Sequence, residues 1–455
     1  MGDDSVPGGG ATLGSKAEVE AILPPGAERH LGGPALFHRR LQPALSVLLL
    51  AAVACAGGAP PATPSTQGPT PPPAVAPTQQ PALSPAASSS APASPRPAAS
   101  PSPASAAAVP VADPAVHVFL WGEPDATDPV LSLARDGGFH WVKQRFEWRN
   151  IEGKGKGRFE WDEPDRLVDA AEARGLKIIA RVDNQPQWAS SKVTWPATSP
   201  PDRMEDWVDY VSALAARYKG RIQAYEIWNE PNLDREWGGQ PPDPKAYTTM
   251  LQASYRAIKA ADPGALVVSA GLSPTTTQSA QAMRDVDFYQ GMYAAGAKGS
   301  YDVLGVHAAG FKAAPCADPA EVAGDPALSN PGDSSPPDVK RVYAFRHVED
   351  VRQIMASNGD GDKQIGVLEM GWTTDQRPNS PYAWHAVSAE QQATNLVDAF
   401  KCAREHWSPW VGFMTVIYIA DAHWTRQDEQ YWWSITNPDG TPRPAYTALK
   451  DFFHS

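Results

Sequence analysis

The sequence is poor in cysteine and in positive charge. Its 455 residues include three cysteines, and none stands at a spacing typical of metal ligands. Lysine and arginine number 39 against 51 aspartate and glutamate residues, which gives a net charge of -12. No basic run and no basic stripe interleaved with aromatic residues is present. These absences argue against a zinc site and against nucleic acid as a partner.

Long apolar runs are also absent. Residues 41–54 form an apolar stretch that follows His38-Arg39-Arg40, but the stretch is too short for a membrane-spanning helix. A basic segment before a short apolar one is the layout of a secretory signal. The stretch ends near Cys55, in Ala52-Val53-Ala54-Cys55-Ala56, which loosely resembles a bacterial lipobox. We therefore expect a secreted or envelope-attached protein, either tethered to a membrane through a lipidated Cys55 or cleaved without an anchor.

Composition divides the chain into three regions. Residues 1–57 hold an N-terminal extension and the signal-type segment. Residues 58–112 are rich in proline, alanine and serine and carry almost no charge. Such a segment cannot bury enough apolar surface to fold, so we expect a disordered linker. Residues 113–455 alternate short apolar runs with amphipathic patterns, and we expect one folded domain there.

The folded region has the pattern of a repeating strand and helix. Eight short apolar runs occupy residues 116–121, 141–146, 177–182, 222–228, 266–270, 303–306, 365–368 and 411–419. Helical patterns between them include residues 163–174, 204–218, 244–261, 339–357 and 389–406. Eight strands alternating with helices predict an α/β fold, a (β/α)8 barrel. An open doubly wound sheet would give a similar pattern, but no Gly-rich phosphate loop follows the first run.

Two carboxylates stand where buried strands are expected to end. Tyr225-Glu226-Ile227-Trp228-Asn229-Glu230-Pro231-Asn232 has the composition of a strand that Pro231 must end, because proline cannot donate to a sheet ladder. The second motif, Gln364-Ile365-Gly366-Val367-Leu368-Glu369-Met370-Gly371-Trp372, is an apolar strand that reaches Glu369. Catalytic residues of a barrel sit at this end of the strands. A surface glutamate at a turn, or a salt-bridged rim residue, is the structural alternative for each.

Both motifs resemble those of the clan A glycoside hydrolases, with the Trp-Asn-Glu-Pro signature at Trp228–Pro231. The resemblance extends over residues 113–455 and leaves a family 39-like and a family 5-like protein both open. It implies that Glu230 is the acid/base, that Asn229 contacts the sugar 2-hydroxyl, and that Glu369 is the nucleophile. Carboxyl groups about 5 Å apart would then cleave a β-linked polysaccharide or oligosaccharide with retention of configuration.

Further residues are candidates for substrate binding by the same resemblance. His307 ends the sixth apolar run and is expected to line the sugar cleft, although Ala309 stands where many relatives have a nucleophile-holding tyrosine. A cation is expected near the nucleophile, and Lys143 and Arg145 share one strand face; Arg145 lies nearer the rim. Other candidates for the walls and floor of the cleft are Asn184, Trp188 and Trp424.

The resemblance implies no cofactor and no metal, and we expect a monomer. For Cys316 and Cys402 we favour free or buried thiols over a disulfide, because one lies in an expected loop and the other late in an expected helix. Three other functions compete with a glycosidase. They are a non-catalytic carbohydrate-binding barrel, a structural lipoprotein, and a metal-dependent hydrolase, which would need clustered histidines and aspartates at the strand ends.

Overall fold

The computed structural model describes residues 108–194 and 197–455. The signal-type segment, Cys55 and nearly all of the proline-rich linker lie outside these residues, so the expectations for them stay predictions. No helix in the described part of the chain is long and apolar enough to cross a membrane.

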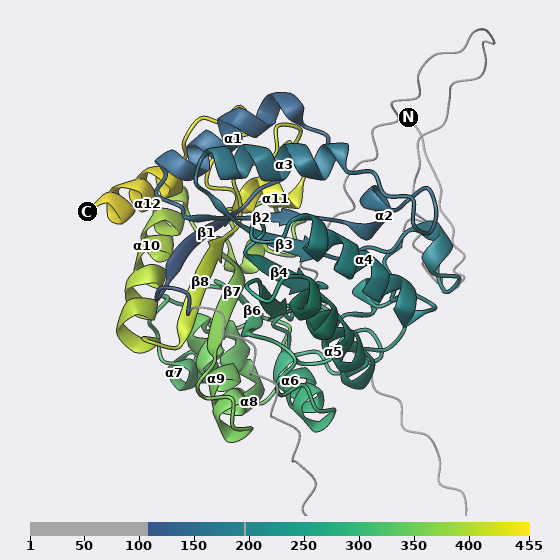
Figure 1. The fold of residues 1–455 in the computed structure, drawn as a ribbon. Helices are drawn as coiled ribbons and strands as arrows, with labels where there is room; N and C mark the ends of the chain where they lie inside the picture. Colours follow the sequence, from purple (N-terminus) through teal and green to yellow (C-terminus); the bar gives the residue numbers. More distant parts are fainter. Residues whose placement is uncertain (1–107, 195–196) are drawn as a thin grey trace, which may run out of the picture. The chain divides into compact units, whose positions relative to one another are not determined.

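The core of the fold is a closed barrel of eight parallel strands in sequential order (Figure 1). The first strand pairs with the last through contacts such as Ala115 with Thr415, which closes the barrel. The strands are β1 Asp113–His117, β2 Trp141–Arg145, β3 Lys177–Val182, β4 Ala224–Ile227, β5 Leu266–Ser269, β6 Val303–Ala309, β7 Gln364–Gly371 and β8 Val411–Val416. The predicted (β/α)8 barrel is confirmed.

The interior of the barrel changes from apolar to polar along the strands. One layer of buried residues is apolar and includes Ala115, Trp141, Ile179, Ala224, Val303 and Phe413. Successive side chains of a strand alternate in direction, so the residue two positions further on shares the same face. Those residues on β1 to β4 are His117, Lys143, Arg181 and Glu226, and all are buried. The carboxyl end of the barrel is therefore lined by charge above an apolar floor.

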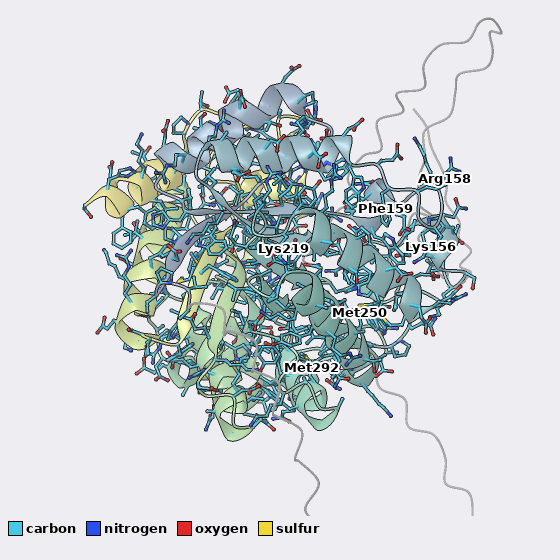
Figure 2. The ribbon with its side chains drawn as sticks, in the orientation of Figure 1. Lys156, Arg158, Phe159, Lys219, Met250 and Met292 are labelled. Atoms are coloured by element: carbon cyan, nitrogen blue, oxygen red, sulfur yellow. A yellow bond between two sulfur atoms is a disulfide. The ribbon has the colours of Figure 1, made fainter. Side chains whose placement is uncertain are left out.

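Helices surround the barrel (Figure 1). The longer ones are α1 Pro124–Asp136, α3 Asp162–Ala173, α4 Met204–Arg217, α5 Pro244–Ala261, α6 Asp285–Ala294, α9 Val348–Ser357, α10 Ala389–His406 and α12 Pro444–His454. Four short helices are α2 Trp148–Ile151, α7 Pro319–Gly324, α8 Pro337–Lys340 and α11 Glu429–Trp433. Figure 2 shows Met250 on α5 and Met292 on α6 within the molecule, while Lys156 and Arg158 stand at its edge.

Helix α5 fixes the end of the strand that leads to Glu230. Asp243 caps the helix by accepting from the backbone N–H groups of Lys245 and Ala246. On the buried face of α5, the Tyr247 hydroxyl donates to the carbonyl of Ile227 across 2.9 Å and accepts from the N–H of Ala270 across 2.6 Å. One helix side chain thus holds the carboxyl ends of β4 and β5 together.

The helix expected over residues 339–357 is wrong, because the segment is broken. It forms α8, two 3-10 turns at Arg341–Tyr343 and Phe345–His347, and α9. Ala344 between the turns is extended, with φ -90° and ψ 138°. Tyr343 packs against Phe311, whereas Phe345 packs against Trp407, with ring centroids 5.1 Å apart in both pairs. Two buried aromatics with different neighbours override the helical pattern.

The expectation of free thiols at Cys316 and Cys402 is also wrong. The two residues form a disulfide with a Cα–Cα distance of 5.6 Å. The bond joins the loop after β6 to α10 across 86 residues of sequence. The sequence spacing could not show that these two segments lie side by side.

Candidate active site

Glu230 is held at the end of β4 by an unusual backbone. Trp228 and Glu230 both adopt positive φ angles, of 73° and 41°, which non-glycine residues rarely do and which cluster at functional sites. The N–H of Glu230 donates to the carbonyl of Gly271 across 3.0 Å. Pro231 has no N–H and so cannot continue this backbone pairing. The side chain of Glu230 is only 4% exposed.

Glu369 lies on β7 and faces the same end of the barrel. It pairs in register with His307 on β6, next to an irregularity between Val306 and His307. Its side chain is 6% exposed. Irregularities of this kind re-aim side chains next to active sites.

His307 lies between the two carboxylates. Its Nδ1 atom is 3.0 Å from Oε1 of Glu230 and 3.9 Å from Oε2 of Glu369. These two oxygens are therefore separated by at most the sum of the two distances, 6.9 Å. Retaining glycosidases place their carboxyl groups about 5 Å apart, and inverting enzymes place them roughly 6.5–9.5 Å apart. The upper bound of 6.9 Å admits the shorter spacing and overlaps the longer range only at its lower end.

The charge of Glu369 is set by the cations around it. Lys143 Nζ lies 3.2 Å from its Oε1 atom, and Arg181 lies 3.6 Å from the same oxygen. Burial alone would raise the pKa of Glu369, but electrostatic interactions with Lys143 first, and then with the His307 and His117 rings and Arg181, outweigh burial and hold that pKa well below its usual range. Glu369 is therefore an ionised carboxylate across the physiological pH range.

Lys143 also contacts Glu226, a second buried carboxyl. Its Nζ atom lies 2.9 Å from Oε2 of Glu226 and donates to the carbonyl of Leu368 across 3.3 Å. Burial raises the pKa of Glu226, and the nearby Lys143 only partly offsets it. Of the two cations considered on β2, Lys143 contacts Glu369, and it lies one layer deeper in the barrel than Arg145.

Arg145 and Asn184 belong to a network at the rim, around Glu147. Arg145 forms ion pairs with Glu147 and Asp183, and the Asn184 amide donates to Oε1 of Glu147 across 3.1 Å. Burial would raise the pKa of Glu147, but Arg145 and Arg149 lower it to about 2. The predicted binding residues Arg145 and Asn184 therefore lie together, and no ion pair or hydrogen bond among the described residues joins either of them to Glu230 or Glu369.

Several buried polar atoms near the carboxylates have no hydrogen-bond partner among the described residues. They include Oδ1 of Asn229, Nε2 of His307 and both ring nitrogens of His117. His117, which sequence reasoning missed, lies with Nδ1 3.7 Å from Glu369. Burial and then the charge of Lys143 lower the pKa of His117, so its ring is neutral. Unsatisfied buried groups are rare in proteins and are the groups that ligand hydroxyls would satisfy.

Trp424 is part of an aromatic cluster beside His117. Its ring lies 4.8 Å from Phe119 and 5.4 Å from Tyr418, measured between centroids. Phe119 in turn stacks on His117 at 4.6 Å. Trp424 lies in the loop after β8, and three successive contacts, through Phe119 and His117, connect it to Glu369.

Trp188 has a different environment. Its indole N–H donates to the carbonyl of Glu152 across 2.7 Å, and its ring packs edge-to-face on Trp148 at 5.4 Å. These contacts stabilise the loop after β3. The structure therefore brings together Glu230, Glu369, His307 and Asn229, and it places Trp188 in supporting packing.

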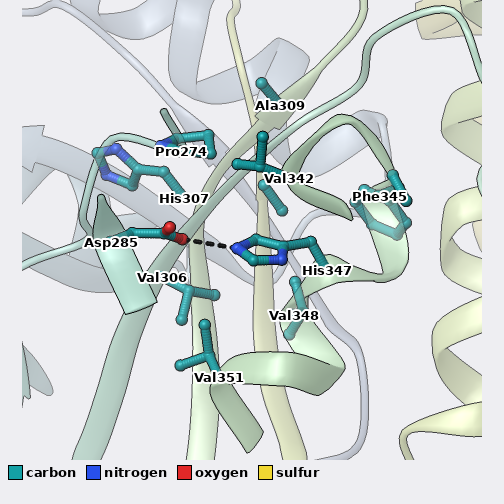
Figure 3. Close-up of a pocket in the computed structure, with 12 residues that line it drawn as sticks. Pro274, Asp285, Val306, His307, Ala309, Val342, Phe345, His347, Val348 and Val351 are labelled. Carbon is teal, nitrogen blue, oxygen red and sulfur yellow. Dashed lines mark hydrogen bonds and ion pairs between the residues drawn. The ribbon is translucent and has the colours of Figure 1, made fainter. Parts of the chain in front are cut away.

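A small hollow lies against β6, lined by residues that include Asp285, Val306, His307, Val342, His347 and Val351 (Figure 3). Figure 3 shows the ion pair between Asp285 and His347 inside it, at 2.9 Å. His347 also contacts Asp350 at 2.9 Å. The histidine is held between two carboxylates, so its polar groups are satisfied within the protein.

Comparison with known proteins agrees with this geometry. Residues 104–305 match the family model Cellulase (glycosyl hydrolase family 5). The structure of a family 39 glycoside hydrolase from Bacteroides cellulosilyticus WH2 is similar, with a TM-score of 0.56 and 19% identity, over 75% of this chain and 63% of that one. The GH39 enzyme from Xanthomonas axonopodis pv. citri is similar with a TM-score of 0.51 and 19% identity, over 76% and 67%.

The chain is similar to clan A glycoside hydrolases in its fold and, over residues 104–305, in its sequence. It spans 63% of the length of the Bacteroides enzyme, which is less than two thirds. No curated protein sequence matches it. The residues matched by the family model include Trp228–Pro231 and end before Glu369.

Proposed function

We propose that the chain is a clan A retaining glycoside hydrolase that cleaves β-linked sugars in a polysaccharide or oligosaccharide. One observation carries the proposal. A single His307 nitrogen lies within 4 Å of both Glu230 and Glu369, which project from the ends of β4 and β7. The similarity of residues 104–305 to a cellulase family supports the β-linkage.

In the first step, the ionised Glu369 attacks the anomeric carbon while Glu230 donates a proton to the departing glycosidic oxygen. The carbon–oxygen bond to the leaving group breaks and a glycosyl ester of Glu369 forms. In the second step, Glu230 takes a proton from a water molecule, which attacks the same carbon and releases Glu369. Two inversions at one carbon give net retention.

The surrounding groups support a sugar as the ligand. Asn229 offers an amide beside Glu230 whose Oδ1 atom has no partner within the described chain. The neutral ring of His117 can both donate and accept a hydrogen bond with a hydroxyl group. Trp424 and its aromatic neighbours supply the flat apolar surface on which a sugar ring stacks.

The full chain would be screened against aryl β-glycosides and against plant and bacterial polysaccharides, with the Glu230→Ala and Glu369→Gln variants alongside. We expect hydrolysis by the parent chain and a loss of at least about 10⁴-fold in Glu369→Gln, with an unchanged melting curve. NMR of the first product would show the retained anomer. An unaltered rate in Glu369→Gln would overturn the assignment, and binding without hydrolysis in all three proteins would favour a carbohydrate-binding barrel.

We also propose that the enzyme is exported as a monomer and tethered through Cys55. The support is the basic and apolar layout of residues 38–54 and the lipobox-like residues around Cys55. Expression of the full chain in a bacterial host with labelled palmitate would test the tether, with Cys55→Ser as the control. Label in both proteins, or in neither, would contradict it.

A further inference from the structure

Arg235 is an arginine that pairs directly with the proposed acid/base. It lies in the 3-10 turn Asp234–Glu236, and its NH2 atom is 3.0 Å from Oε2 of Glu230. The other oxygen of Glu230, Oε1, faces His307 and therefore the nucleophile. The turn is anchored because the Trp228 indole donates to the carbonyl of Glu236 across 2.8 Å. Arg235 and His307 thus contact different oxygens of Glu230.

This ion pair is incompatible with one half of the reaction. Glu230 must carry a proton before it can donate one, whereas a guanidinium pairs with an ionised carboxylate. The pair must therefore open when Glu230 becomes the acid. A charge that loses its partner in a largely buried site is costly, so another anion must receive Arg235.

The other carboxyl groups near Arg235 are poor alternative partners for its guanidinium. Glu236 lies 3.7 Å from Arg235, and Glu429 is near enough to sense the charges of Arg235 and Glu230. Burial raises the pKa of Glu236 to about 7 and that of Glu429 to about 8. Both side chains are therefore largely protonated in mildly acidic solution and carry little charge for Arg235.

A ligand can reach Arg235. Its side chain is 30% exposed, against 4% for Glu230. Its buried Nε atom has no hydrogen-bond partner among the described residues, so the guanidinium has unused donors. Glu230 protonates the oxygen of the leaving-group sugar. Arg235 contacts Glu230 and is partly exposed, so we expect it to border the position of that sugar.

We propose that Arg235 selects substrates that carry an anionic group, a carboxylate or a sulfate ester, on the leaving-group sugar. The inference rests on the proposed glycosidase function. When such a substrate binds, the guanidinium turns from Oε2 of Glu230 to the substrate anion, and Glu230 is left free to hold its proton. A neutral substrate leaves the ion pair in place.

Aryl β-glycosides of the sugar found in the screen would test this on the full chain. Matched leaving groups would be 3-carboxyphenyl against 3-carbamoylphenyl, and 3-sulfophenyl against 3-sulfamoylphenyl. We expect kcat/KM to be about tenfold higher for the anionic member of at least one pair, which is the low end for a charge-assisted hydrogen bond. Preference for the carboxylate alone would indicate a uronic acid, and preference for the sulfonate would indicate a sulfated sugar.

Three variants separate recognition from general damage. In Arg235→Gln the preference should fall to about one, and in Arg235→Lys part of it should remain. Arg284→Gln is the control, because Arg284 is similarly exposed, at 29%, and pairs with a carboxylate that has no part in the proposed site, so the full preference should persist. Equal rates within both pairs for the parent chain, or an unchanged preference in Arg235→Gln, would overturn the inference. If the parent chain hydrolysed none of the four glycosides, the proposed function would be overturned instead.

Discussion

Lys143 on β2 donates to Oε1 of Glu369 on β7 across 3.2 Å. These strands are not neighbours in the barrel, so the contact crosses its interior. It supplies a fixed positive charge to the proposed nucleophile. It also explains how Glu369 is oriented in a chain that has Ala309 where many relatives of the clan have a tyrosine.

Removal of this cation should damage both activity and stability. Lys143→Met leaves Glu226 and Glu369 buried without their shared partner, which should cost about 3–5 kcal/mol of unfolding free energy. The misplaced nucleophile should lower kcat/KM by about 100-fold. Urea denaturation and steady-state kinetics would measure the two effects.

A double variant separates the effect on activity from the effect on stability. Glu226→Gln added to Lys143→Met removes one unpaired charge, so stability should partly recover while kcat/KM stays low. Recovery of activity together with stability would mean that Lys143 acts only on the fold.

Gly271 should be intolerant of even a methyl group. A Cβ atom there would overlap the ring of His307, and the carbonyl of Gly271 accepts from the N–H of Glu230. Gly271→Ala should therefore shift both residues and lower kcat/KM by roughly 10- to 100-fold. Gly324→Ala on α7 is the control, since nothing lies within 4 Å of an added Cβ atom. Equal activity of the two variants would contradict the close contact.

The disulfide between Cys316 and Cys402 should stabilise the barrel. A bond that closes a loop of this length restricts the unfolded chain and should contribute about 4 kcal/mol. Cys316→Ser combined with Cys402→Ser should lower the melting temperature, and dithiothreitol should lower it only in the parent chain. A reductant effect of equal size in the double variant would show that the bond is not its cause.

Because of His347, the free energy of unfolding should fall as the pH becomes alkaline. Burial alone would lower its pKa, but Asp285 and Asp350 together raise that pKa to about 10. A histidine with a raised folded-state pKa contributes fully below its unfolded value near 6.5, and the contribution is lost as pH rises through about 10. Urea midpoints between pH 6 and 10.5 should fall by an amount equivalent to up to about 4 kcal/mol. In His347→Gln that slope should flatten, and an equally steep slope there would assign the effect to another group.

The barrel was predictable because its strands are short apolar runs that recur between helical patterns. The residues at which the strands begin and end were harder to predict. The first strand was expected at residues 116–121 and is Asp113–His117, because the apolar residues after His117 lie in the loop beyond the ladder. Pro114 is tolerated near the start of that strand, where a missing donor matters least.

The two glutamates were readable because each is marked by a local pattern, an apolar strand that reaches a carboxylate. The choice between Lys143 and Arg145 could not be predicted, because both share one strand face and only the stagger of the barrel decides which of them contacts Glu369. His117 and Arg235 gave no local signal at all. Their contacts depend on the closure between β1 and β8 and on the path of the loop after β4.

The covalent ring closed by Cys316 and Cys402 contains β7, and therefore Glu369. A protease that cuts the exposed part of the segment between these cysteines would leave two pieces that cannot diffuse apart. The strand that bears the nucleophile would stay tied to the rest of the enzyme until the bond is reduced. In an oxidising environment, nicking between the two cysteines should be visible only on a reducing gel.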